Sequence, residues 1–131
     1  MILYSSELSN YCSKVRFLIH YKKLKIKLIS PPGGYGSSEF KKINPLGTIP
    51  FLKTKKSNIF DSQIINEYLN NLYPNPPMLS KNFDVNLKIR LLSNFHDQKL
   101  EPAIRYFFKF KKNSNFKNDL IYEGFNVLKE R

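Results

Sequence analysis

The chain has very little cysteine and no tryptophan: one of its 131 residues is a cysteine. A single cysteine excludes an intramolecular disulfide framework and any metal site that needs several thiolates. Neither of the two histidines has a second ligand at metal-binding spacing, so we expect no metal site. The sequence therefore predicts a protein of a reducing compartment, which we expect to be the cytoplasm.

Long hydrophobic runs are also missing. No apolar stretch approaches the ~18 residues that a membrane-spanning helix requires, and the first residues lack the basic flank and apolar core of a signal peptide. We therefore expect no membrane partner. Apolar residues still make up 41% of the chain, which is enough for a packed core in one domain, or in one domain and part of another.

Acidic residues are scarce: 10 aspartates and glutamates stand against 22 lysines and arginines, for a formal net charge of +12. A basic surface can attract nucleic acid. The basic residues, however, are mostly lysines scattered along the chain, without arginine-rich or glycine-interleaved motifs. The sequence does not favour a nucleic-acid partner.

The first 75 residues combine strand and helix patterns. An apolar run over residues 1–5 suits a buried strand, and helical spacing begins at about Ser9. Residues 24–28 alternate between apolar residues and lysines, as in a strand with one solvated face. Prolines and glycines argue against regular structure over residues 30–38.

Two further strands are predicted at residues 51–54 and 59–60, and Asp61 or Ser62 is a natural N-cap for a helix that Pro74 ends. The apolar residues that we expect this helix to bury are Ile64, Ile65, Tyr68, Leu69 and Leu72. The order strand, helix, strand, loop, strand, strand, helix predicts an α/β domain over residues 1–75.

A proline-rich linker follows at residues 76–81, and the pattern from residue 82 to residue 131 is helical. Pro102 should kink or divide the long helix there, and residues 119–131 can form one more helix. So few helices cannot bury their apolar faces against one another. We therefore expect a partial all-helical domain, or one that needs a partner.

Three places in this pattern together predict a site for a thiol ligand. The Ile49–Pro50 bond lies at a strand edge, the usual place for a cis proline, where the backbone of Ile49 could pair with an extended peptide. Asp61 and Ser62 open a helix and can bind an ammonium and an anion. Ser9 lies at the mouth of another helix, where a hydroxyl donor and the helix dipole favour a thiolate.

The segments "LYSSELSNYCSKVR", "EFKKINPLGTIPFL" and "FDSQIINEYL" resemble the glutathione S-transferase family, and "KLEPAIRYFF" is similar to the first helix of its second domain. The resemblance implies a thioredoxin-like N-terminal domain (βαβ-ββα) followed by an incomplete all-α domain. The stretch "SNYC" lies where glutaredoxin-like relatives carry C-P-Y-C. Ser9 therefore matches the nucleophilic cysteine of those relatives, and Cys12 matches the second, more buried one.

The resemblance also implies roles for these residues. The co-substrate would be glutathione, with Ser9 donating a hydrogen bond to its thiolate, which then attacks a small hydrophobic electrophile. Ile49 would pair with the cysteinyl part and Pro50 would hold that geometry. Ser62 would take the γ-glutamyl carboxylate, and Asp61 would face the ammonium, although the family more often has the longer Glu or Gln at this position.

The partner of the glycyl carboxylate stays open. Thr48 stands where some members of the family carry Lys or Gln, so that Lys41 or Lys42 could substitute. Ser9 could also be an N-cap only. Tyr4 is a rival hydroxyl, although a buried ring is the stronger expectation, and Cys12 is expected to be a packed, unreactive thiol.

The leading functional prediction is a glutathione transferase that forms a homodimer. One alternative is a non-catalytic transferase-like module that assembles with translation or transcription proteins. Retention of Ser9, Ile49–Pro50 and Asp61–Ser62 together argues against that module, because a scaffold does not need the ligand half of the site. The other alternative is a glutathione-dependent isomerase, which ranks lower because such members usually have a denser serine–cysteine cluster than "LSNYC".

Overall fold

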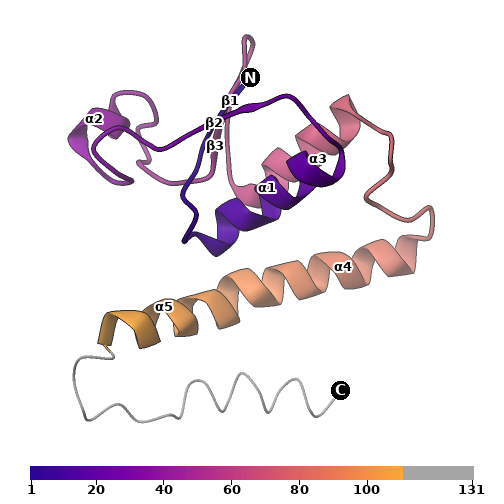
Figure 1. Ribbon diagram of the computed structural model, residues 1–131. Coiled ribbons are helices and arrows are strands. Elements are labelled where there is room, and N and C mark those ends of the chain that lie inside the picture. The colour runs from indigo at the N-terminus through magenta and orange to yellow at the C-terminus, as the bar shows by residue number, and fades with distance from the viewer. Residues whose placement is uncertain (111–131) are drawn as a thin grey trace. The chain divides into compact units, whose positions relative to one another are not determined.

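The computed structural model describes residues 1–110, with side chains as far as residue 106. The predicted helix at 119–131 lies outside this range. The chain divides into two compact units, residues 1–78 and 79–131, which are described separately below (Figure 1). None of the helices described in residues 1–110 is both long and apolar enough to cross a membrane.

A four-stranded mixed sheet forms the centre of the first unit, in the strand order β2-β1-β3-β4. The strands are β1 (Ile2–Tyr4), β2 (Lys27–Ile29), β3 (Phe51–Lys53) and β4 (Asn58–Phe60). β1 pairs with β2 in parallel and with β3 antiparallel, and β3 pairs antiparallel with β4. The predicted α/β fold class and the order βαβ-ββα are confirmed.

Helices α1 (Asn10–Tyr21) and α3 (Ser62–Leu72) pack against each other in the first unit (Figure 1). Their apolar stripes and the inward residues of the strands make one core, in which the buried residues are Leu3, Val15, Leu18, Ile19, Ile26, Leu52, Ile65 and Leu69. Burying each large aliphatic side chain contributes about 1.5–3 kcal/mol. This core therefore fixes both helices relative to the sheet.

The short helix α2 (Ser38–Lys41) brings Phe40 to a second, aromatic cluster, formed with Tyr4 and Phe51. The ring centroid of Tyr4 lies 5.3 Å from that of Phe40 and 5.8 Å from that of Phe51. Successive side chains of a strand point to opposite faces. Leu3 and Tyr4 therefore belong to different clusters, one on each face of the sheet.

Several details of the predicted pattern are wrong. Ser38 lies in a span expected to be irregular but begins α2, whose N-cap is the Ser37 side chain. In β2, which starts at residue 27, Leu28 is 47% exposed because this strand is at the edge of the sheet. Ile64 and Leu72 of α3 are 53% and 49% exposed. The buried stripe of α3 is narrower than predicted because it follows only Ser62, Ile65 and Leu69.

A buried lysine ends α1. The N–H of Lys22 caps the helix by donating to backbone carbonyls of its last turn, and its ammonium donates to the carbonyl oxygens of Tyr73 and Pro76. The side chain is buried, and this burial lowers the pKa of Lys22 from its usual value of 10.5. Lys22 thus joins the end of α1 to the segment that follows α3.

The second unit begins with α4 (Phe83–Phe95), capped by the side chain of Asn82. A π-helical turn at His96–Leu100 follows, and α5 (Glu101–Phe110) comes after it. Proline has no N–H, and its ring clashes with the carbonyl four residues earlier, so a wider turn just before Pro102 relieves the helix. The long helix thus continues through Pro102 and is interrupted only by the π-helical turn before it, so that the expected division is not seen.

Candidate active site

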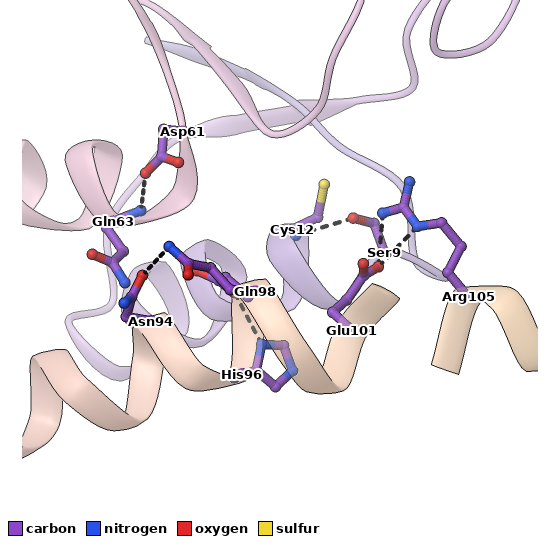
Figure 2. A network of polar contacts seen from close by, with 10 residues as sticks. Ser9, Cys12, Asp61, Gln63, Asn94, His96, Gln98, Glu101 and Arg105 are labelled. Carbon is purple, nitrogen blue, oxygen red and sulfur yellow. Dashed lines mark hydrogen bonds and ion pairs between the residues drawn. The ribbon is translucent and has the colours of Figure 1, made fainter. Parts of the chain in front are cut away.

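Ser9 is the N-cap of α1, as one of the two predicted roles requires. Its backbone is extended, and its Oγ accepts a hydrogen bond from the Cys12 N–H at 3.3 Å (Figure 2). Because Oγ is used as an acceptor, the hydroxyl proton can be donated elsewhere. The cap and a donor role toward a thiolate are therefore compatible in one side chain.

The two rival groups near Ser9 are both buried. Cys12 is fully buried, which confirms the prediction of a packed thiol. Tyr4 is 7% exposed and packs against Phe40 and Phe51, which confirms the expectation of a buried ring. Ser9, in contrast, is only partly buried. Of the three groups considered on the sequence, Ser9 is the one with access to a ligand.

The Ile49–Pro50 peptide is cis, as predicted. The Ile49 side chain packs against the aromatic cluster, and Pro50 is buried. Within the described part of the chain, the backbone N–H and C=O of Ile49 make no hydrogen bond. This segment therefore presents one backbone donor and one acceptor beside the sheet, held by apolar packing on its other side.

Asn44 holds the loop that leads to Ile49, a role that the sequence reasoning missed. It is 2% exposed, and its side-chain amide donates to the Thr48 carbonyl oxygen at 2.9 Å. The backbone carbonyl oxygen of Asn44 accepts from the N–H of Gly47 at 2.8 Å. Gly47 has a φ of 65°, a conformation that suits glycine. The only available sequence signal was that Asn44 opens the motif "NPLGTIP".

Lys41 lies along the same loop. A Cβ built on Gly47 would meet the Lys41 side chain at 3.2 Å, so the aliphatic part of this lysine packs against the loop. A lysine can lie on an apolar surface in this way and keep its ammonium in water. Of the two lysines considered for a carboxylate, the structure brings Lys41 to the segment before Ile49.

Asp61 is the N-cap of α3, which confirms one of the two predicted caps. Its Oδ1 accepts from the N–H of Gln63 at 2.8 Å (Figure 2), and also from that of Ile64 at 3.2 Å. Its φ of 71° is in the left-handed region, which is uncommon outside glycine. Ser62 begins the helix and is 3% exposed, so its backbone N–H is one of the donors that the first turn leaves without an intrahelical acceptor.

Strand register brings the predicted site residues to one end of the sheet. Tyr4 is level with Phe51, and Phe51 is level with Phe60. Pro50 comes directly before Phe51, and Asp61 directly after Phe60, so both lie one step beyond this row. β1 also ends at this end of the sheet, and Ser9 follows its last residue, Tyr4, by five positions. Antiparallel pairing therefore brings the predicted residues Pro50 and Asp61 to the same end of the sheet, although they are distant in sequence.

Two other features of the described residues are separate from this site. An apolar cavity of about 260 Å³ is lined by residues 43–46, Phe51, Asn58 and Phe60, among which none of the predicted site residues occurs. In residues 1–106, no three His, Cys, Asp or Glu side chains are grouped so that they could hold a metal ion. His96 contacts the neighbouring Asp97 at 2.9 Å in the second unit (Figure 2).

Comparisons with known proteins point to one family. The family described as "Glutathione S-transferase, N-terminal domain" matches residues 3–77. Glutathione S-transferase Z1 of Arabidopsis thaliana is 32% identical, over 98% of this chain and 63% of its own length. A stringent starvation protein A homolog of Coxiella burnetii is also 32% identical, over 60% of this chain and 38% of its own length.

Solved structures show the same fold. A bacterial maleyl pyruvate isomerase, described as a zeta-class glutathione S-transferase, superimposes with a TM-score of 0.78 at 21% identity, over 97% of this chain and 66% of that one. The chain spans less than two thirds of the length of each of these relatives. The match over more than half of the chain shows the family: this protein belongs to the glutathione S-transferases and has their thioredoxin-like N-terminal domain.

Proposed function

We propose that this chain binds glutathione at the end of the sheet and activates its thiol with Ser9. The observation that carries the proposal is the cap geometry: Oγ of Ser9 accepts from Cys12 N–H, and its proton is available to donate to sulfur. The helix dipole adds to this donor, and together they favour the thiolate. Lowering the pKa of the bound thiol by one to three units corresponds to about 1.4–4 kcal/mol.

The peptide part of glutathione is proposed to bind as an added strand. The unpaired N–H and C=O of Ile49 would take the cysteinyl backbone, and Pro50 would hold them in place. Asp61 would face the α-ammonium. Ser62, through its N–H at the start of α3, would take the γ-glutamyl carboxylate. Lys41, which packs on the loop before Ile49, is the proposed partner of the glycyl carboxylate.

The proposed reaction uses this thiolate as a nucleophile. The thiol loses its proton to solvent, and Ser9 stabilises the sulfur anion. With an aryl halide, the C–S bond forms as the carbon–halogen bond breaks and halide leaves. With a maleyl keto acid, the C–S bond forms as the π bond of the double bond breaks, and after rotation the thiolate is expelled again as the double bond re-forms. The zeta-class relative named above is a maleyl pyruvate isomerase. A maleyl keto acid is therefore the first specific substrate to test for glutathione-dependent isomerisation, beside an aryl halide for conjugation. A homodimer is the proposed assembly.

The decisive experiment separates the two roles of Ser9. Wild type, Ser9→Ala and Ser9→Asp are titrated with glutathione by calorimetry, and thiolate absorbance of the bound ligand is followed against pH. Aspartate keeps an acceptor for the helix cap but has no proton to donate at neutral pH. We expect both variants to raise the pKa of the bound thiol by about 1–2 units, while only Ser9→Ala loses stability.

The matched control is Ser57→Ala, an exposed serine in the turn between β3 and β4. It should leave both the affinity for glutathione and the pKa of the bound thiol unchanged. Failure of the folded wild type to bind glutathione would overturn the proposal. That result would favour the non-catalytic assembly module, for which the similarity to a stringent starvation protein homolog is the supporting observation.

A further inference from the structure

The chain between the two units is held by the first unit as far as residue 78. Lys22 Nζ donates to the carbonyl oxygen of Tyr73 at 2.7 Å and also to that of Pro76. The N–H of Met78 donates to Asn70 Oδ1 of α3 at 3.3 Å, and the Met78 side chain packs against the core. The residues that follow α3 are therefore part of the first unit and are not a free linker.

From Ser80 onward the chain is held by α4. The N–H of Ser80 donates to Asn86 Oδ1 at 3.0 Å, and Asn86 Nδ2 donates to the Ser80 carbonyl oxygen at 2.7 Å. The Ser80 Oγ accepts from the N–H of Asn82 at 3.0 Å. Ser80 is thus bonded both to the N-cap residue of α4 and to the first turn of that helix.

Leu79 lies between these two sets of contacts. Within the described part of the chain its N–H donates no hydrogen bond. Rotation about its φ and ψ would break none of the bonds named above, whereas rotation at Tyr73, Pro76 or Ser80 would break at least one, and rotation about φ of Met78 would move its packed side chain. Hinges are usually a few residues that absorb the change in φ and ψ.

We propose that the chain bends at Leu79 and the peptide bond before it, and that Lys22 and Asn86 confine bending to this point from the two sides. All six proposed glutathione-site residues precede residue 78, so motion at Leu79 leaves that site intact. Insofar as it concerns catalysis, the inference rests on the proposed function. It then predicts that substitutions at Leu79 leave the affinity for glutathione unchanged.

The first test measures the spread of distances between the units. Spin labels are attached at Lys25→Cys and Lys88→Cys, both exposed positions, and the width of the distance distribution is recorded by pulsed electron resonance. Leu79→Pro, which fixes φ and removes an N–H that has no partner, should narrow the distribution. Lys22→Met and Asn86→Ala should each broaden it, because each lengthens the free segment. The matched control, Lys23→Met, should leave the width unchanged.

The second test reads the hinge without spin labels. Amide exchange by NMR should show the Leu79 N–H exchanging about five- to tenfold faster than those of Met78 and Ser80, which are hydrogen-bonded. In Lys22→Met, faster exchange should spread toward Tyr73. Equal exchange at residues 78, 79 and 80, or a distance distribution unaffected by Leu79→Pro, would overturn the hinge.

The two proposals fail in different ways. A wild type that does not bind glutathione, but whose distance distribution responds to Leu79→Pro and Lys22→Met, would contradict only the proposed function. A Leu79→Pro variant that binds glutathione normally, with an unchanged distance distribution, would contradict only the hinge.

Discussion

The ammonium of Lys22 lies 2.7 Å from the carbonyl oxygen of Tyr73, a residue 51 positions further along the chain. It also donates to the carbonyl oxygen of Pro76. A buried lysine normally needs a carboxylate partner, but two carbonyl oxygens can also receive its protons. The end of α1 and the segment after α3 therefore depend on one side chain.

Replacing Lys22 by methionine should lower the free energy of unfolding by about 1–3 kcal/mol, because two carbonyl oxygens lose their charged donor. Urea unfolding followed by circular dichroism measures this loss. Lys25→Met, at an exposed position close in sequence, is the control and should be nearly neutral. Equal stability of Lys22→Met and wild type would show that the carbonyls find water instead.

The stability difference between wild type and Lys22→Met should depend on pH in the alkaline range. Burial lowers the pKa of Lys22 in the folded state below 10.5, its value when unfolded. Between the two values the unfolded chain binds more protons, so wild-type stability relative to Lys22→Met should rise with pH. The difference should level off above about pH 10.5. A fall through this window, measured by urea unfolding at successive pH values, would contradict the direction of the shift.

Asn44→Ala should loosen the loop before Ile49. Loss of its bond to Thr48 should cost about 1–3 kcal/mol of stability, and the KM for glutathione should rise more than kcat falls, because the loop would position the ligand and not the sulfur. Steady-state kinetics with varied glutathione tests this. Asn71→Ala, an exposed position on α3, serves as the control. An unchanged KM in a folded Asn44→Ala variant would remove this residue from the site.

Tyr4→Phe should change kcat/KM by no more than about twofold, because this ring is buried and Ser9 is the proposed donor. Tyr4→Ala, in contrast, should cost about 3–5 kcal/mol through loss of packing against Phe40 and Phe51. Activity assays and thermal unfolding on the same preparations separate the two effects. A large loss of activity in a stable Tyr4→Phe variant would restore the tyrosine as the catalytic hydroxyl.

Sequence reasoning reached those parts of the fold that strong local patterns encode. The periodic stripes of α1 and α3, the caps at Ser9 and Asp61, and the cis bond before Pro50 each have a signal within a few residues. Helix α2 has four residues, which is barely one helical turn and too short for a periodic pattern. It was missed for this reason, although the cap at Ser37 was present in the sequence.

The remaining differences depend on partners that are distant in sequence. Nothing local separates Lys22, which is buried, from Lys23 and Lys25, which are exposed; its acceptors lie more than fifty positions away. Ile64 and Leu72 are as apolar as their neighbours, and only the placement of α3 on its core decides which face is covered. The role of Asn44 was missed because a buried amide and a polar loop residue look the same in a sequence.

The π-helical turn before Pro102 also determines how the sequence of the second unit must be read. A turn with i→i+5 bonds contains one residue more than an α-helical turn, so the angular phase of side chains shifts by about 100° across it. A helical wheel drawn through α4 therefore does not extend into α5. Deleting one residue from His96–Leu100 would make the axis regular, rotate every side chain of α5 around it, and return Pro102 to a clash with the carbonyl of the residue four positions before it.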